Sequence, residues 1–168
     1  MTPLIRVPIE AIEASLEVMQ RVGAGAREVA LFWLGDMDTF AVATVVLPGG
    51  PGVQWEPLSL RLREAWMLRL AELCDELGVV VLGAVHSHPV AAFMSGIDRD
   101  AFFHAPDFVS VVIPDYGRTR VEDAASTWAV FVGLPGNGWR AGSWGDEVEI
   151  IAGDVEIVEL PGRDAQGT

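Results

Sequence analysis

Two histidines, His86 and His88, stand two residues apart at the end of the apolar run Val79–Val85. Side chains two positions apart on a strand point to the same side, so both imidazoles can face one point. Asp98 can add a carboxylate if the intervening loop folds back over the end of the strand. Two imidazoles and one carboxylate form a recurring catalytic zinc site that leaves the fourth position for water. The spacing therefore makes these three residues candidate metal ligands.

Other interpretations of the same residues stay open. An H-x-H pattern on its own is often two unrelated histidines. Ser95 and Asp98 also match a helix capping box, in which Ser95 caps the first turn and Asp98 bonds back to it. The two roles are compatible, because a carboxylate in the first turn has one oxygen for a metal.

A hydrolase also needs a group that takes a proton from the attacking water, and Glu28 is the candidate. It begins a predicted strand whose other residues, Val29–Leu34, are all apolar. The simpler explanation is a solvated strand end that follows Arg27. The catalytic role requires the strand of Glu28 to lie next to the strand of His86, and we predict that it does.

Hydrophobic periodicity predicts the elements that must position these side chains. We expect helices at residues 9–22, 58–77 and 95–104, and strands at 28–34, 39–47, 79–86, 108–113, 127–134 and 139–143. The segment 148–160 can add one or two edge strands. This α-β-β-α-β-α-β-β-β order predicts an α/β fold with a mixed sheet flanked by helices. Residues 1–160 then form one domain, and 161–168 form a flexible tail.

Composition narrows the classes of function. The 168 residues are 51% hydrophobic and carry a formal net charge of -13, which disfavours nucleic acid and membrane surfaces as partners. The single cysteine, Cys74, excludes an internal disulfide and a cysteine-cluster zinc site. No apolar run approaches a membrane span, and residues 1–13 do not resemble a secretion signal. We therefore expect a cytoplasmic protein.

Three short stretches together resemble the signature of the JAMM (MPN+, JAB-domain) zinc metallopeptidases, and of their prokaryotic deubiquitinase-like members in particular. These stretches are Glu28–Gly35, His86–Pro89 and the pair Ser95-x-x-Asp98. Residues 92–98 are similar to the matching segment of K63-type deubiquitinases, and the order of elements agrees over roughly residues 4–134. One departure is the link between His88 and Ser95, whose six residues are one fewer than is usual in the family. This shorter link makes Asp100 an alternative third ligand, although Asp98 keeps the S-x-x-D relation.

The resemblance implies an MPN-type, cytidine-deaminase-like architecture. It also implies one zinc ion per chain, with a bound water, held by His86, His88 and Asp98. It assigns Glu28 the role of general acid and base and makes Ser95 a group that stabilises the oxyanion. Zinc lowers the pKa of its water from about 16 towards 7, which allows such chemistry at neutral pH.

The resemblance also implies a substrate. Most members hydrolyse the peptide or isopeptide bond after the C-terminal glycine of a ubiquitin-like protein, and others process sulfur-carrier proteins. Similar bacterial members work beside E1-like and E2-like conjugation enzymes or in antiviral operons. Trp55, in the long loop 48–57, and Phe93 are the expected substrate contacts. The alternatives are a metal-free MPN-like scaffold that binds partners without catalysis, and an unrelated enzyme in which both histidines are core residues.

Overall fold

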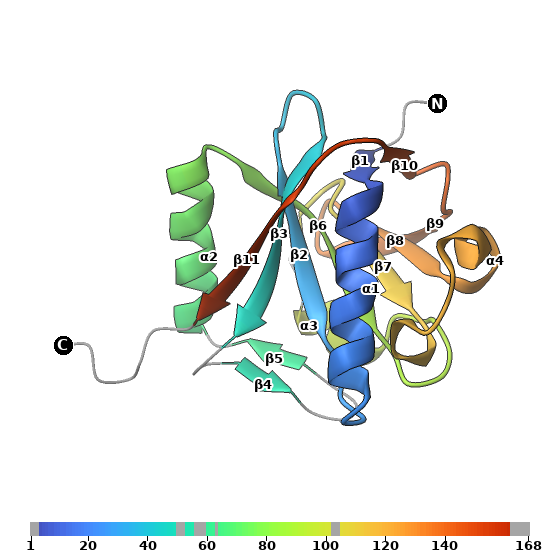
Figure 1. The fold of residues 1–168 in the computed structure, drawn as a ribbon. Helices are drawn as coiled ribbons and strands as arrows, with labels where there is room; N and C mark the ends of the chain where they lie inside the picture. The colour runs from blue at the N-terminus through green and yellow to red at the C-terminus, as the bar shows by residue number, and fades with distance from the viewer. Residues whose placement is uncertain (1–3, 50–52, 56–59, 63, 102–104, 162–168) are drawn as a thin grey trace.

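A seven-stranded mixed sheet crosses the molecule, and helices lie on both of its faces (Figure 1). This computed structural model describes residues 4–49, 53–55, 60–62, 64–101 and 105–161. The helical segments are α1 (Ile9–Gly23), α2 (Glu64–Leu77), α3 (Gly96–Ala101), α4 (Ala124–Thr127) and the 3-10 turns η1 (Asp115–Gly117) and η2 (Val121–Asp123). The strands are β1 (Ile5–Pro8), β2 (Ala30–Gly35), β3 (Val42–Gly49), β4 (Val53–Trp55), β5 (Leu60–Leu62), β6 (Val80–Ser87), β7 (Val109–Ile113), β8 (Ala129–Leu134), β9 (Gly138–Gly142), β10 (Val148–Ile151) and β11 (Glu156–Pro161).

Strand order in the main sheet brings together the parts of the chain that carry the candidate residues. The order is β11-β3-β2-β6-β7-β8-β9, so β6 lies between β2 and β7. Strand β2 runs antiparallel to β6 and pairs Ala30 with His86. Strand β7 runs parallel to β6 and is reached through a connection that contains α3. Because Glu28 lies two residues before Ala30, the prediction that its segment neighbours the His86 strand is confirmed.

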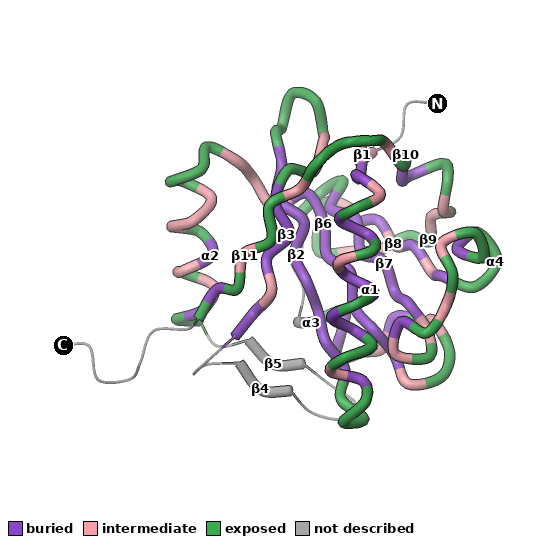
Figure 2. Tube along the Cα trace, viewed as in Figure 1, coloured by how far each residue is buried: buried purple, intermediate pink, exposed green. Residues whose placement is uncertain are grey.

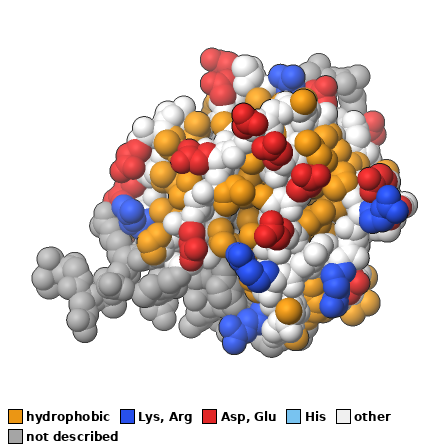
Figure 3. Space-filling view, in the orientation of Figure 1, with side chains coloured by type: hydrophobic (Ala, Val, Ile, Leu, Met, Phe, Trp, Pro, Cys, Tyr) orange, Lys and Arg blue, Asp and Glu red, His pale blue; other side chains and the backbone are white. Residues whose placement is uncertain are grey.

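Helix α1 covers one face of the sheet because its apolar residues recur at helical spacing. Ile12 and Met19 are buried against the sheet, whereas Glu13 and Glu17 are exposed. Figure 2 shows this division, with the central strands buried and much of the outer side of α1 exposed. Acidic side chains are scattered over the same face in the space-filling view (Figure 3). The helix therefore faces solvent with its charged side and the core with its apolar side.

Helix α2 covers the other face of the sheet through Trp66 and Leu70, which are both buried. The Trp66 ring lies against Phe32 of β2, with 5.4 Å between ring centroids. Its Nε1 donates a hydrogen bond of 2.8 Å to the carbonyl of Leu160 in β11. This bond ties α2 to the edge strand of the sheet.

The start of α2 differs from the sequence prediction. A helix was expected from residue 58, but β5 pairs antiparallel with β4 and the helix begins only at Glu64. Leucines at positions 58, 60 and 62 alternate with a period of two. That spacing is typical of a strand, whereas Leu62, Trp66 and Leu70 recur every four residues, as in a helix. Pairing with β4 decides that Leu62 belongs to a strand.

The predicted mixed sheet flanked by helices is confirmed. The segment 148–160 supplies two strands, since β10 pairs in parallel with β1 and β11 becomes the edge strand beside β3. The strand expected from residue 28 begins at Ala30. Residues 102–104 of the third predicted helix, and 162–168 of the predicted tail, lie outside the described residues. Among the described helices, none has the length and apolar character needed to cross a membrane.

Candidate metal centre

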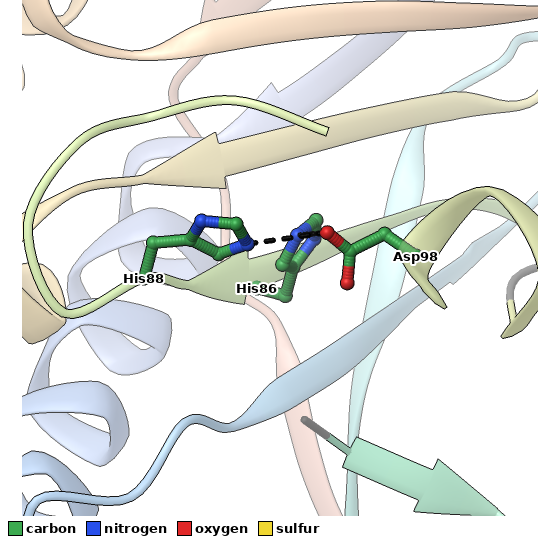
Figure 4. A group of neighbouring side chains, drawn as sticks. All are labelled: His86, His88 and Asp98. Atoms are coloured by element: carbon green, nitrogen blue, oxygen red, sulfur yellow. Dashed lines mark hydrogen bonds and ion pairs between the residues drawn. The ribbon is translucent and has the colours of Figure 1, made fainter. Parts of the chain in front are cut away.

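His86, His88 and Asp98 converge at the end of β6, and Figure 4 shows their side chains pointing toward one another. All three are buried, and one ligand atom from each lies within 4.8 Å of the other two. Asp98 Oδ2 is 3.2 Å from His88 Nε2 and 3.5 Å from His86 Nε2. No second group of three such side chains occurs in the part of the chain that the structure describes. Asp100, the alternative third ligand, is exposed and stands outside this group.

Main-chain pairing explains why the two histidines face the same point. His86 belongs to β6, and His88 follows its last residue. His88 stays in line with the strand because its N–H donates to the carbonyl of Ile113 at 2.9 Å. The carbonyl of His88 in turn accepts a 2.9 Å bond from the N–H of Tyr116. The strand alternation therefore continues past the end of β6, and the two imidazole centroids are 5.1 Å apart.

The capping box at the start of α3 places the carboxylate. The N–H of Asp98 donates to Ser95 Oγ at 3.1 Å, and the N–H of Ser95 donates to Asp98 Oδ2 at 2.8 Å. The structural role and the convergence on the histidines are thus both present. Both roles use the same oxygen of Asp98, Oδ2, whereas the sequence suggested that a separate oxygen would be left for the metal. The six-residue link from His88 is long enough to bring Ser95 and Asp98 back to the strand end.

The protonation of His86 and Asp98 suits a metal site. Burial lowers the pKa of His86, which favours the neutral imidazole. Burial opposes ionisation of Asp98, but hydrogen bonds with His86, His88 and Ser95 outweigh it and hold the pKa of Asp98 well below its usual range. A neutral imidazole and an ionised carboxylate are the forms that bind metal ions. Two nitrogen ligands and one oxygen ligand in a buried cluster fit zinc.

Glu28 is buried beside this cluster, with only 5% of its surface exposed. Burial raises its pKa to about 7, an effect that the charge of His88 opposes and that of Asp98 reinforces. The alternative interpretation of a solvated strand end is therefore wrong. A carboxyl group with a pKa near neutrality can both accept and return a proton at physiological pH.

Ser87 is a positioning residue that the sequence analysis missed. Its Oγ accepts a 3.1 Å hydrogen bond from the N–H of Val29, and its own N–H donates to the carbonyl of Val29 at 3.0 Å. These two bonds hold the residue next to Glu28 against the strand of the histidines. The available signal was a single hydroxyl group on a strand that is otherwise apolar apart from His86, at a fully buried position between the two candidate ligands.

A cavity of about 300 Å³ opens beside the cluster, with Glu28, His88, Phe93 and Ser95 in its lining. Phe93 is 53% exposed, and its ring meets His88 at an edge with 4.7 Å between centroids. Ser95 Oγ accepts from the N–H of Asp98, and that bond does not use the hydroxyl proton. Trp55 lies in β4, but its side chain is outside the described part of the chain.

Comparison with known proteins supports the fold more than the function. No family model matches the chain, and no curated protein matches its sequence. A solution structure of a Desulfitobacterium hafniense protein has 17% identity and a TM-score of 0.59, and the match covers 96% of this chain and 97% of that one. A JAB1/MPN domain protein from Archaeoglobus fulgidus has 14% identity and a TM-score of 0.42, with 92% and 97% covered. The first similarity indicates a shared fold over nearly the whole chain.

Proposed function

We propose that this chain is a zinc-dependent peptidase or isopeptidase of the JAMM type. Its zinc ligands are His86, His88 and Asp98, and Glu28 is its general acid and base. The observation that carries the proposal is the position of a buried carboxyl group with a pKa of about 7 beside three converging, buried ligand side chains. A purely structural cluster has no use for such a group, because burying an ionisable carboxyl group destabilises the fold.

The chain's own residues account for the proton transfers and the charge stabilisation. A zinc ion held by His86, His88 and Asp98 would supply a Lewis acid and would lower the pKa of a water molecule bound to it towards 7. Glu28 accepts a proton from the attacking water and returns it to the leaving amine. The Ser95 hydroxyl, at the cavity wall, donates to the oxyanion of the substrate. One such donor is typically worth about 3 kcal/mol of transition-state stabilisation.

The proposed substrate is a ubiquitin-like or sulfur-carrier protein, cleaved after its C-terminal glycine. Glycine has no side chain, so its backbone can approach a buried carboxyl group closely. Phe93 and the apolar residues Pro89, Val90 and Ala91 border the cavity and can pack against an extended tail. We place the enzyme in the bacterial cytoplasm, where E1-like or E2-like conjugation enzymes would be further partners.

The test combines metal analysis with cleavage of reporter fusions. The purified protein is assayed for zinc and incubated with fusions of the small glycine-tailed proteins of its own genome, and the cut bond is located by mass spectrometry. We expect about one zinc per chain and cleavage directly after the terminal glycine. Glu28→Ala is expected to keep the zinc and lose cleavage, whereas His88→Ala loses both.

Two results contradict the proposal in different ways. A wild-type protein that takes up no zinc favours the metal-free scaffold. Zinc uptake together with near-normal cleavage by Glu28→Ala would show that another group moves the proton.

A further inference from the structure

The segment after β7 contains three consecutive residues in the left-handed region. Asp115 has φ 50°, Tyr116 has φ 52° and Gly117 has φ 77°. Glycine adopts this region freely, but a bulky aromatic residue there is a conformational outlier. Such a backbone persists only when the surrounding structure enforces it, and outliers of this kind cluster at functional sites. The contacts of this turn, η1, therefore indicate what it is for.

The C-terminal half of α1 holds the turn in place. The side-chain amide of Gln20 donates a 2.9 Å hydrogen bond to the carbonyl of Gly117. Gly23 is buried against Tyr116, and a Cβ added at Gly23 would lie 2.8 Å from Tyr116 Cγ and closer still to Tyr116 Cβ. A Cβ at Gly117 would lie 2.7 Å from Cβ of Met19. Helix and turn are thus in direct contact, and only glycine fits at Gly23 without displacement.

The other side of the turn reaches the candidate metal centre. The N–H of Tyr116 donates a 2.9 Å hydrogen bond to the carbonyl of His88. That carbonyl belongs to the peptide that begins the link to Ser95 and Asp98. Strand β7 holds the N–H of His88, through the carbonyl of Ile113. The turn holds the carbonyl of His88, from which the chain continues toward Ser95 and Asp98.

We propose that the left-handed turn Asp115–Gly117 positions His88 for metal binding, and that Gln20 and Gly23 of α1 act on the metal ligand through it. The inference rests on the proposed function, since it assigns the turn to the same metal centre. Gln20 and Gly23 are positioning residues, because neither lies among the converging ligands. The turn is more than a connection between β7 and η2, because a simple connection has no need of enforced left-handed geometry at Tyr116.

The experiment compares two substitutions that differ in one contact. Gly23→Ala introduces the clash with Tyr116, whereas Gly25→Ala adds a Cβ whose nearest neighbour is the carbonyl oxygen of Val22 at 3.5 Å, an ordinary contact. Alanine otherwise favours a helix over glycine, so weaker metal binding by Gly23→Ala cannot come from lower helix propensity. Gln20→Ala removes the hydrogen bond without adding bulk, and Glu13→Ala is its control at an exposed position of the same helix.

Two readouts separate a positioning role from a structural one. Amide hydrogen exchange of Tyr116 in the metal-free protein reports its bond to His88, and competition with a chromophoric chelator gives the zinc dissociation constant. We expect Gly23→Ala to speed the exchange of Tyr116 and to weaken zinc binding about 10-fold or more, as groups that orient metal ligands commonly do. For Gln20→Ala we expect the exchange of Tyr116 to be about fivefold faster and zinc binding to be about fivefold weaker. The two controls should stay within about twofold of the wild type.

Each outcome decides the inference. Unchanged exchange and unchanged zinc affinity in both Gly23→Ala and Gln20→Ala overturn it. Faster exchange with unchanged zinc affinity also overturns it, because the turn would then be structural only. If Gly23→Ala does not fold, Gln20→Ala decides alone. A wild-type protein that binds no zinc refutes the proposed function instead, and the exchange comparison still shows whether α1 holds the turn against His88.

Discussion

Replacing Glu28 by glutamine tests whether this carboxyl group is buried at a cost to the fold. Glutamine has nearly the shape of a protonated glutamate and does not ionise. In the folded protein the pKa of Glu28 is raised from 4.5 to about 7 because burial disfavours the charged form. The folded state therefore keeps the proton to a higher pH than the unfolded state does. The contribution of Glu28 to the stability of the fold is complete below pH 4.5 and is lost as the pH rises through 7.

The size of the effect follows from the shift. About 2.5 pKa units at roughly 1.4 kcal/mol each correspond to about 3 kcal/mol between pH 4.5 and pH 8. Glu28→Gln should therefore be more stable than the wild type by up to about 3 kcal/mol at pH 8 and by close to zero at pH 4.5. In thermal unfolding, a gain of that size corresponds to roughly 6–12 °C in Tm for a chain of this length.

The assay is urea unfolding of metal-free protein, with a chelator present, at pH 4.5 and pH 8. Glu13→Gln, at an exposed position of α1, serves as the control and should change stability by less than about 0.5 kcal/mol at either pH. A stability difference for Glu28→Gln that is the same at both pH values would refute the reasoning, since the carboxyl group would then be in contact with solvent. The same variant should lose cleavage activity, which would make Glu28 a group kept for function at the expense of stability.

Other substitutions test the remaining parts of the site. Asp98→Asn should abolish zinc uptake in a metal assay, whereas Asp100→Asn, in the same helix but exposed, should keep it; equal uptake would mean that Asp98 is only a helix cap. Ser95→Ala should lower kcat about 100-fold with little change in KM, and a change confined to KM would contradict its role at the oxyanion. Ser87→Ala removes the acceptor of the buried Val29 N–H, so urea unfolding should show a loss of about 1–3 kcal/mol; unchanged stability would mean that this bond contributes nothing.

The three candidate metal ligands could be selected from the sequence because each lies in a recognisable local pattern. Residues two apart on a strand share a side, which predicts that His86 and His88 face one point as long as the strand geometry continues to His88. The i, i+3 relation of a capping box likewise places Ser95 and Asp98 on one helical turn. The mixed sheet flanked by helices could also be predicted, since the hydrophobic periods of its elements are local properties.

Apart from the pairing of the Glu28 segment with the His86 strand, which the proposed chemistry required, contacts between distant segments could not be predicted in this way. The pairing of β11 with β3, the pairing of β10 with β1 and the late start of α2 all depend on which strand lies beside which. Leu62 fits both the period of two in the preceding leucines and the helical spacing of Trp66 and Leu70, so only pairing with β4 assigned it to a strand. The sequence also left open whether Glu28 meets solvent or the core, because a residue at a strand end can do either.

Residue identity and short-range spacing were enough to select the side chains able to bind a metal, because these depend on neighbours within one strand or one helical turn. The tertiary structure alone decided that Glu28 is buried, that Ser87 holds Val29 and that α1 supports a left-handed turn against His88. Burial, long-range hydrogen bonds and enforced backbone geometry arise only when distant segments pack together. The properties that would make this site reactive, rather than merely able to bind, therefore come from packing.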